Sequence, residues 1–308
     1  RGLKVTILEA KNRIGGRVFS HHPSSSPDQV IELGAEWVGQ SHSLIISLCK
    51  KFGLTLENNQ FETHLTQNGQ YFKNGKWNLS PAFEKFWKSK KTEWESMPDK
   101  QKKKLDRKDW WRFLSDKNFE DRDLLLRELM DSTDFGESIR HVSAYAAFAE
   151  FAESSEKNEM DFKIKGGNAM LAKNLAEAVG EKNILLNHFV SKVDQRGAMV
   201  KVTCKIGATF TADKVICTLP TFSVNKLEWL PALPPEKIYA IKSLQYARIN
   251  KHPVLFSEKF WPEDFDMVTD LPAHYFYNAA KNQPGTKGVL MSYTIGDKAA
   301  VIANQEDA

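Results

Sequence analysis

The composition of the 308-residue chain, with 41% hydrophobic and 27% charged side chains, excludes a disordered chain and a fibrous repeat and is typical of a soluble globular protein. Its length allows two domains. No uninterrupted apolar run approaches the roughly 18 residues of a membrane span, so we expect neither a membrane helix nor a signal peptide. The net charge is +4, and residues 85–112 alone carry +6, from eleven Lys and Arg against five Asp and Glu, so the rest of the chain is close to neutral.

The first elements have an α/β character. Residues 4–8 are predicted to form a buried parallel strand that ends at Glu9, and residues 43–52 a helix closed by Gly53. Asn-Gly pairs at residues 68–69 and 74–75 indicate hairpins.

Residues 81–151 have a helical pattern that Pro98 interrupts, and they are predicted to form a separate helical layer. Five of the eight tryptophans lie in or beside the basic segment, a mixture that could indicate nucleic-acid or membrane-surface contact. Basic residues mixed with acids at helical spacing more often form a solvated face, with the tryptophans on the buried side. We therefore favour a solvated face and expect no nucleic-acid partner.

The stretch "IKGGNAMLAKNLAEAVG" predicts a glycine turn and a helix ending at Gly180. Short strands follow at residues 184–186, 191–193, 200–204 and 209–211, and "KVICTLP" reads as a further apolar strand. This succession indicates an antiparallel meander on the α/β core. Two more strands are predicted at residues 252–256 and 288–294, in a mainly β layer.

The number and spacing of the cysteines and histidines predict no metal site. The three cysteines, Cys49, Cys204 and Cys217, are odd in number and lack C-x-x-C spacing, which argues against a disulfide framework and against structural zinc. His21 and His22 lie in a Ser/Pro-rich loop without a third ligand. Few cysteines are compatible with a reducing compartment, and we expect a cytoplasmic protein.

Nucleotide chemistry is suggested near the N-terminus. A carboxylate such as Glu9, at the end of a Rossmann strand, can bind both ribose hydroxyls of an adenosine. The pair Gly15 and Gly16 lets the main chain approach a phosphate, and Arg17 can pair with a pyrophosphate. The alternative is an ordinary strand end, a tight turn and an exposed arginine.

A third segment, "IELGAEWVGQSHSLIISLCKKFGL", places Gly34 and Ala35 before a bulky ring, Trp37. Such a turn could bring main chain against a flat ring system, although a strand, turn and helix that pack Trp37 into the core explain the pattern equally well.

The order of "ILEAKNRIGGRV", "ELGAEWVG", "KFGL", "IKGGNAMLAKNLAEAVG", "HFVSKV", "VICTLP" and "NKHPVLFSEKFW" resembles the flavin-dependent amine oxidases, which include monoamine, polyamine and L-amino-acid oxidases. The resemblance covers essentially the whole chain, loosely between residues 81 and 161. It implies that FAD is the cofactor, and that an amine is oxidised to an imine while O₂ becomes hydrogen peroxide.

Carried over to this chain, the resemblance implies that Glu9 binds the adenosine ribose, with Lys11 nearby, and that Gly15, Gly16 and Arg17 hold the pyrophosphate. Val190 would pair with the adenine edge through its main chain. Four residues would lie along the flavin: Gly34, Ala35, Glu36 and Trp37. Lys251, ten residues before Trp261, matches the lysine that holds a water against flavin N5, so it is the candidate catalytic residue.

The expected fold class is α/β, with an incomplete Rossmann-like FAD-binding domain that carries a β-meander (residues 1–76 and 164–222) and an α+β substrate domain (residues 77–163 and 223–308). Relative to the family, we expect the chain to lack the N-terminal glycine-rich loop and the C-terminal FAD segment. A truncated form of this kind is expected to bind FAD weakly or not at all.

Within the family, Gly39 stands where plant polyamine oxidases carry an acidic residue, which favours a monoamine-oxidase-like pattern, although Glu36 could replace that acid. A polyamine oxidase and an L-amino-acid oxidase stay open. Further alternatives are a related flavin enzyme that acts on C–C bonds and a non-catalytic interaction protein that binds an acidic partner through residues 85–112.

Overall fold

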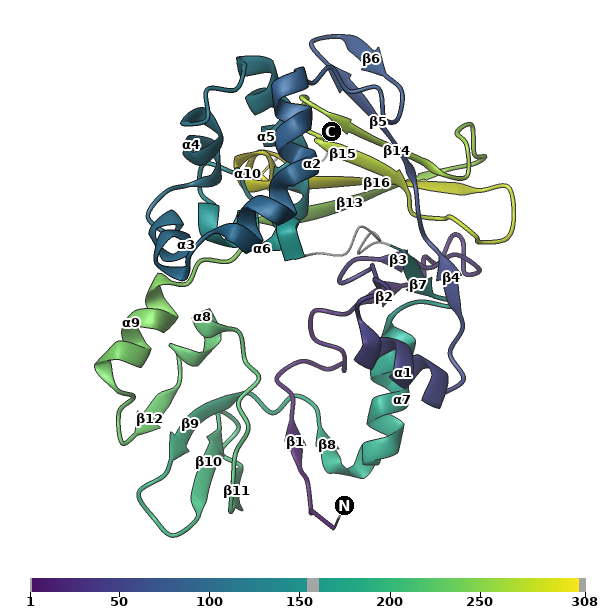
Figure 1. Ribbon diagram of the computed structural model, residues 1–308. Coiled ribbons are helices and arrows are strands. Elements are labelled where there is room, and N and C mark those ends of the chain that lie inside the picture. Colours follow the sequence, from purple (N-terminus) through teal and green to yellow (C-terminus); the bar gives the residue numbers. More distant parts are fainter. Residues whose placement is uncertain (1, 154–160, 305–308) are drawn as a thin grey trace. The chain divides into compact units, whose positions relative to one another are not determined.

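The computed structural model describes residues 2–153 and 161–304. The chain forms two compact units and passes between them three times (Figure 1). The first unit comprises Arg1–Val18 and Ala169–Tyr246, and the second comprises Phe19–Asn168 and Ala247–Ala308. These bounds differ from those of the predicted domains, because residues 19–76 and 164–168 group with the helical layer and residues 223–246 with the meander. The division into FAD-binding and substrate domains stays a prediction.

The first unit holds a short parallel strand pair and the meander. The strand β1 (Ile7–Leu8) pairs in parallel with β8 (Ile184–Leu185), and α7 (Ala169–Val179) and η1 (Glu181–Asn183) precede β8. A four-stranded sheet has the order β11 (Thr209–Ala212), β10 (Val200–Cys204), β9 (Val190–Asp194) and β12 (Glu228–Leu230). Two helices complete the unit: α8 (Thr221–Val224) and α9 (Pro235–Ser243). The predicted antiparallel meander is confirmed in β9, β10 and β11.

Two details of this unit correct the sequence-based expectations. Residues 4–8 were predicted to form a buried strand, but only Ile7–Leu8 is a strand, and Leu3 and Val5 are 83% and 47% exposed. "KVICTLP" forms no strand, and Ile216 is 89% exposed. Among the described residues, no strand pairs with residues 4–6 or with "KVICTLP", so apolar composition alone does not order these residues as a sheet.

The second unit is built on a six-stranded sheet. Its order is β13 (Ile249–Phe256), β16 (Gly288–Ile295), β15 (Tyr275–Asn278), β14 (Phe265–Thr269), β5 (Glu62–Gln67) and β6 (Gln70–Phe72). All neighbouring pairs are antiparallel except β14 and β5. Asn68 and Gly69 both have positive φ in the tight turn between β5 and β6, which confirms the first predicted hairpin. The hairpin predicted at residues 74–75 was wrong, because the turn there is followed by a helix and not by a strand. The elements outside this sheet are β2 (Ser20–His21), β3 (Ile31–Glu32), α1 (Ser43–Lys51), β4 (Leu56–Asn58), β7 (Phe162–Ile164) and α10 (Gly296–Ala303).

The predicted helical layer consists of α2 (Pro81–Ser96), α3 (Asp99–Leu105), α4 (Trp110–Ser115), α5 (Asp121–Phe135) and α6 (Ala144–Glu153). The interruption at Pro98 is confirmed, because α2 ends at Ser96 and α3 begins at Asp99. Gly136 ends α5 with φ of 68°, and a Cβ there would lie 2.8 Å from the Ile249 side chain. This glycine therefore allows both the helix end and close packing against β13.

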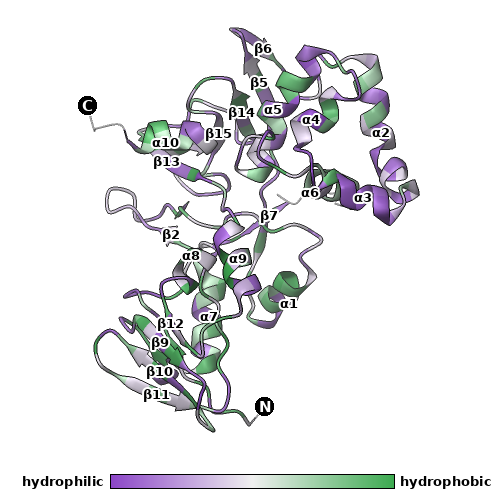
Figure 2. Ribbon diagram, turned by 90° about the vertical axis from the view of Figure 1, so that its left-hand side faces the viewer, coloured by the Kyte–Doolittle hydropathy of each residue, from purple (hydrophilic) through white to green (hydrophobic). Residues whose placement is uncertain are grey.

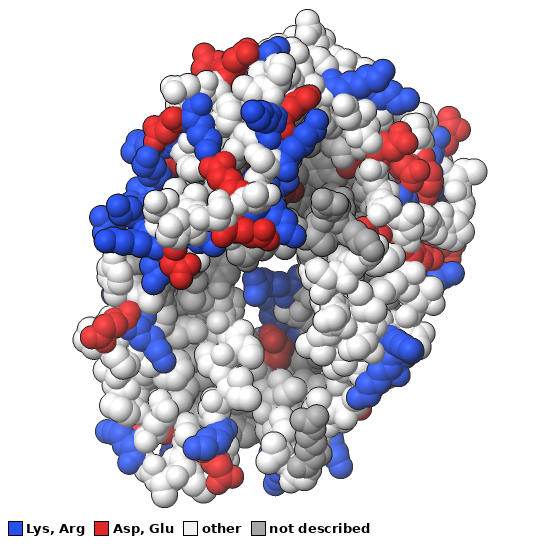
Figure 3. Space-filling model, in the orientation of Figure 1, with Lys and Arg blue, Asp and Glu red and all other residues white. Residues whose placement is uncertain are grey.

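The basic segment has the solvated character that we favoured. Trp94 and Trp110 are 3% and 0% exposed, inside an apolar core shared by α2, α4 and α6. Lys and Arg are interspersed with Asp and Glu over these helices (Figure 3), and α3 is hydrophilic along its length (Figure 2). The Nζ of Lys102 lies 4.5 Å from the centroid of the Trp94 ring, within the range of a cation–π interaction.

Candidate functional site

Lys251 lies within β13, and only 8% of its side chain is exposed. Its Nζ donates hydrogen bonds to the main-chain oxygens of Glu32, at 3.1 Å, and of Gly34, at 2.9 Å. It also forms an ion pair with Glu36, whose Oε2 lies 2.8 Å away. The three N–H groups of the ammonium therefore all have acceptors, which a buried positive charge requires.

The carboxylate of Glu36 is 1% exposed and accepts a second hydrogen bond, from the hydroxyl of Tyr277 at 2.5 Å. Burial, reinforced by the Glu36 charge, raises the pKa of Tyr277 well above its usual value. Tyr277 therefore keeps its proton at neutral pH and acts as the donor. Lys251 and Tyr277 reach the same carboxylate oxygen from β13 and β15, which β16 separates.

Aromatic rings surround this ion pair. The Trp37 ring lies 5.0 Å from the Nζ of Lys251, within the range of a cation–π interaction. Its centroid is 5.5 Å from that of Tyr277 and 6.1 Å from that of Tyr293. Lys251 and Tyr293 are opposite each other on β13 and β16, so both side chains lie on one face of the sheet. The result is a set of flat rings around one cation.

Asn168 holds the loop of residues 34–37 in place. Its side-chain amide donates to the main-chain oxygens of Glu36, at 2.6 Å, and of Ala35, at 3.2 Å. Its main-chain N–H donates to the Glu32 carboxylate at 2.7 Å. Burial is the largest cause that raises the pKa of Glu32 above its usual value. Asn168 thereby fixes both the loop and the acidic residue that precedes it.

Sequence reasoning missed five residues of this site: Glu32, Lys163, Asn168, Tyr277 and Tyr293. Lys163, on β7, is 5% exposed, and burial lowers its pKa while the nearby charges of Glu36 and Glu32 oppose that shift. The only sequence signal for Asn168 was its place after the glycine pair in "IKGGN". Tyr277 stands in the strand "YFYN", where nothing marks one tyrosine as the partner of a glutamate.

In the first unit, the segment after β1 is a tight turn that contains the predicted pyrophosphate residues Gly15, Gly16 and Arg17. Gly15 and Gly16 have φ of 96° and 55°. A Cβ on Gly15 would lie 2.6 Å from the main-chain oxygen of Val18, whereas a Cβ on Gly16 would meet nothing within 4 Å. Gly15 is therefore required for the turn itself, and Gly16 leaves open space beside its main chain.

The charged groups of this turn have contrasting surroundings. The Glu9 carboxylate accepts the main-chain N–H of Lys11 at 2.8 Å. Arg13 folds over the turn and donates to the main-chain oxygen of Gly16 at 2.9 Å. Arg17 is exposed and forms no hydrogen bond or ion pair with any residue that the structure describes. Its guanidinium is therefore available for a ligand.

The predicted site residues divide between the two units. The second unit brings together five of them in one cluster: Gly34, Ala35, Glu36, Trp37 and Lys251. The first unit holds the other six: Glu9, Lys11, Gly15, Gly16, Arg17 and Val190, the last being the first residue of β9. The binding and catalytic roles of all eleven stay predictions.

The family model for flavin-containing amine oxidoreductases matches residues 1–308. The chain belongs to this family. The predicted family is thereby confirmed, and its description is that of a flavin-containing family.

Curated relatives include L-amino-acid oxidases. The enzyme from Echis ocellatus is 28% identical over 336 residues, covering 96% of this chain and 64% of the relative. That from Vipera ammodytes ammodytes is also 28% identical and covers 97% of this chain and 67% of the relative. The chain thus spans about two thirds of the length of these relatives.

Solved structures show the same fold. A triple mutant of putrescine oxidase superposes with a TM-score of 0.85 at 18% identity, covering 99% of this chain and 73% of that one. Cyclohexylamine oxidase from Brevibacterium oxydans gives a TM-score of 0.84, also at 18% identity and with the same coverage. The predicted α/β class with a Rossmann-like part is confirmed.

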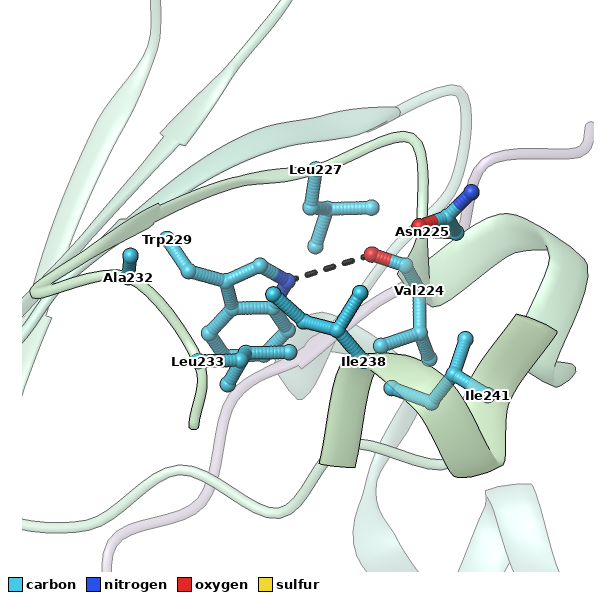
Figure 4. Close-up of a pocket in the computed structure, with 8 residues that line it drawn as sticks. All are labelled: Val224, Asn225, Leu227, Trp229, Ala232, Leu233, Ile238 and Ile241. Carbon is cyan, nitrogen blue, oxygen red and sulfur yellow. Dashed lines mark hydrogen bonds between the residues drawn. The ribbon is translucent and has the colours of Figure 1, made fainter. Parts of the chain in front are cut away.

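Three further features lie outside the candidate site. An apolar pocket of about 180 Å³ in the first unit contains no predicted site residue; its lining is Val224, Asn225, Leu227, Trp229, Ala232, Leu233, Ile238 and Ile241 (Figure 4). Within the described ranges, no three His, Cys, Asp or Glu side chains come together to hold a metal ion. No helix in the same ranges is long and apolar enough to span a membrane.

Proposed function

We propose that the whole protein oxidises an amine with FAD and O₂ and releases hydrogen peroxide, and that Lys251 is its catalytic lysine. The observation that carries this proposal is the buried Lys251 ammonium, which the main chain and carboxylate of residues 32–36 hold beside the ring of Trp37. A fixed positive charge among flat rings suits a site where negative charge develops on a ring system.

The residues present fit FAD. The open space beside Gly16 and the unpaired guanidinium of Arg17 suit a pyrophosphate, and the Glu9 carboxylate, at the end of β1, suits a ribose. The main-chain groups of Val190 would form hydrogen bonds with the edge of the adenine ring. In the second unit, the Nε1 of Trp37 is buried without a hydrogen-bond partner among the described residues, so it is a donor left for a ligand.

When bound, FAD supplies the hydride acceptor and the route for electrons to O₂. The chain's own residues orient the amine and exclude water. Lys251 supplies a positive charge, and the rings of Trp37 and Tyr293 supply a flat apolar surface against which an uncharged amine packs.

The proposed substrate class follows from the hydrogen bonds that Glu36 already makes within the protein. This carboxylate is already bound to Lys251 and Tyr277, so it is not available for the remote ammonium of a polyamine. We therefore favour a substrate with a single amino group, either a monoamine or an L-amino acid. The L-amino-acid oxidases among the relatives support the second of these.

The test combines FAD titration of the purified chain with hydrogen peroxide assays over a panel of monoamines, L-amino acids and diamines. We expect peroxide release with one of the first two classes, and a loss of about 100-fold in the Lys251→Met variant, as is typical when one stabilising group is removed. Lys287→Met is the control, because Lys287 is exposed and binds only a main-chain oxygen, that of Ser25, at 2.8 Å. The titration also measures whether FAD binding is weak, as the sequence predicted.

Peroxide release from diamines alone would reverse the substrate assignment. Oxidation of a C–C bond without amine turnover would place the protein among related flavin enzymes of another class. FAD that binds without any turnover over the whole panel would contradict the proposed activity.

A further inference from the structure

We propose that Glu36 and Tyr277 are positioning residues that hold the Lys251 ammonium in place, so that Glu36 is the anchor of the lysine and not a ligand of the cofactor. The proposal rests on the proposed function for the role of Lys251, while the contacts that carry it do not depend on that role. Both donors bind one carboxylate oxygen, Oε2, at 2.8 Å for Lys251 and 2.5 Å for Tyr277.

Three features make Glu36 the fixed partner of Lys251. It is the only one of the three acceptors of Lys251 that carries a negative charge, since the oxygens of Glu32 and Gly34 belong to the main chain. Its own main-chain oxygen is bound by Asn168, so the residue cannot move freely. A neutral carbonyl gives up its donor to an incoming ligand more easily than a buried carboxylate gives up its counter-ion.

Tyr277 completes the anchor from the sheet. Its side chain is 0% exposed, and its ring packs against Trp37. With Tyr277 on β15, Lys251 on β13 and Glu36 in the loop after β3, the ion pair is fixed by three separate elements. Lys251 is therefore directed by groups that need not touch the amine.

The other charged groups that face this cluster are few. Glu32, on β3, and Lys163, on β7, contribute one charge of each sign, and both interact electrostatically with Glu36. Neither accepts or donates a side-chain hydrogen bond to Lys251 among the described residues. The direct partner of the lysine is Glu36.

The same sheet contains a matched control. Tyr275, two residues before Tyr277 on β15, donates to the buried carboxylate of Asp266 at 2.6 Å. The second donor to Asp266 is the Thr63 hydroxyl, at 3.1 Å, whereas the second donor to Glu36 is Lys251. The variants Tyr275→Phe and Asp266→Asn therefore remove equivalent groups from an equivalent pair that does not hold Lys251.

The first experiment measures the acetylation rate of Lys251 by acetic anhydride, with peptide mass spectrometry, in the purified chain without FAD. Loss of the counter-ion favours the uncharged, reactive amine. We expect Lys251 to react about tenfold faster or more in Glu36→Gln, and several-fold faster in Tyr277→Phe. Tyr275→Phe and Asp266→Asn should leave the rate within about twofold. Glu36→Asp, which keeps the charge, should restore most of the protection.

The proposal is overturned if Glu36→Gln leaves the rate unchanged, or if the two control variants raise it equally. Unfolding by urea identifies any variant that has lost its structure. Should Glu36→Gln fail to fold, Glu36→Asp and Tyr277→Phe carry the same comparison.

The second experiment uses the FAD-loaded protein and measures the kinetic constants for O₂ and for the amine separately. We expect Glu36→Gln to lower kcat/KM for O₂ about tenfold or more, with the KM for the amine within about twofold. A merely structural role would change both values or neither, and either outcome would overturn the positioning role. If the loaded wild-type protein turns over no amine, the proposed function fails, while the acetylation rates still decide whether Glu36 anchors Lys251.

Discussion

Two arginines of one turn, Arg13 and Arg17, lie four residues apart and have opposite surroundings. Arg13 donates to main-chain oxygens of its own turn, including that of Gly16 at 2.9 Å, so its charge serves the local structure. Arg17 is exposed, without a partner in the described part of the chain. An arginine that is not used by the fold is free to pair with an anion through two parallel hydrogen bonds.

We therefore expect Arg17→Gln to weaken FAD binding about tenfold or more, because a charge-assisted contact with the pyrophosphate is lost. Isothermal titration or the quenching of flavin fluorescence measures this change. Arg196→Gln is the control, since Arg196 is an exposed arginine of the same unit that pairs with Asp194. Equal affinities for the wild type and Arg17→Gln would remove Arg17 from the cofactor site.

At the scale of the element, one buried carboxylate, that of Asp123, forms hydrogen bonds at the N-termini of two helices, α2 and α5. Asp123 accepts the main-chain N–H of Ser80 at 2.7 Å and the Ser80 hydroxyl at 2.6 Å, and Ser80 is the N-cap of α2. Asp123 is also the N3 residue in the capping box of α5, with Glu120 as the N-cap. The starts of α2 and α5 are thereby tied to each other.

Ser80→Ala should lower the free energy of unfolding by about 2 kcal/mol, because it removes an N-cap and leaves the buried Asp123 carboxylate with fewer donors. Urea denaturation followed by circular dichroism measures this loss. The matched serine is Ser89, which lies inside the same helix and donates only to the main-chain oxygen of Phe86. Ser89→Ala should change the free energy by less than about 0.5 kcal/mol, and equal losses in the two variants would contradict the capping role.

Local signals explain which elements were predictable. Pro98 interrupts the helices, Gly180 follows α7, and residues 68–69 form a hairpin turn, because each effect acts over a few residues of main chain. The strand predicted in "KVICTLP" was wrong, since a strand needs a pairing partner that no local pattern supplies. Within the site, resemblance identified Lys251 and Glu36 separately, but their contact joins residues 215 positions apart and depends on the tertiary fold.

At the scale of the whole molecule, a buried histidine links three elements of the second unit. His274 is 1% exposed; its Nε2 lies 2.9 Å from the Thr133 hydroxyl on α5, and its Nδ1 lies 3.2 Å from the Lys298 ammonium on α10. Burial, with the Lys298 charge, lowers the pKa of His274 to about 3. The neutral imidazole can accept a hydrogen bond from the Lys298 ammonium and bind the Thr133 hydroxyl, whereas a charged imidazolium would be repelled by Lys298.

The unfolded chain therefore binds a proton at His274 at a higher pH than the folded chain does. The stabilisation that this residue contributes is fully present above pH 6.5 and is lost as the pH falls toward 3, by up to about 1.4 kcal/mol per pH unit. Urea unfolding at pH 7.5 and pH 4.5 should show a drop of a few kcal/mol in the wild type and a smaller drop in His274→Gln. An equal drop in both proteins would assign the acid sensitivity to other groups.

The parallel pairing of β5 with β14 joins Glu62 to Phe265 and Thr66 to Thr269. A ribosome needs roughly 10 to 40 s to add the intervening 200 or so residues. During that interval the nascent β5–β6 hairpin has no neighbour along one edge, and all of the first unit from α7 onward emerges before that neighbour does. Until residues 265–269 emerge, the free edge of β5 is therefore a site at which newly made chains pair with another polypeptide.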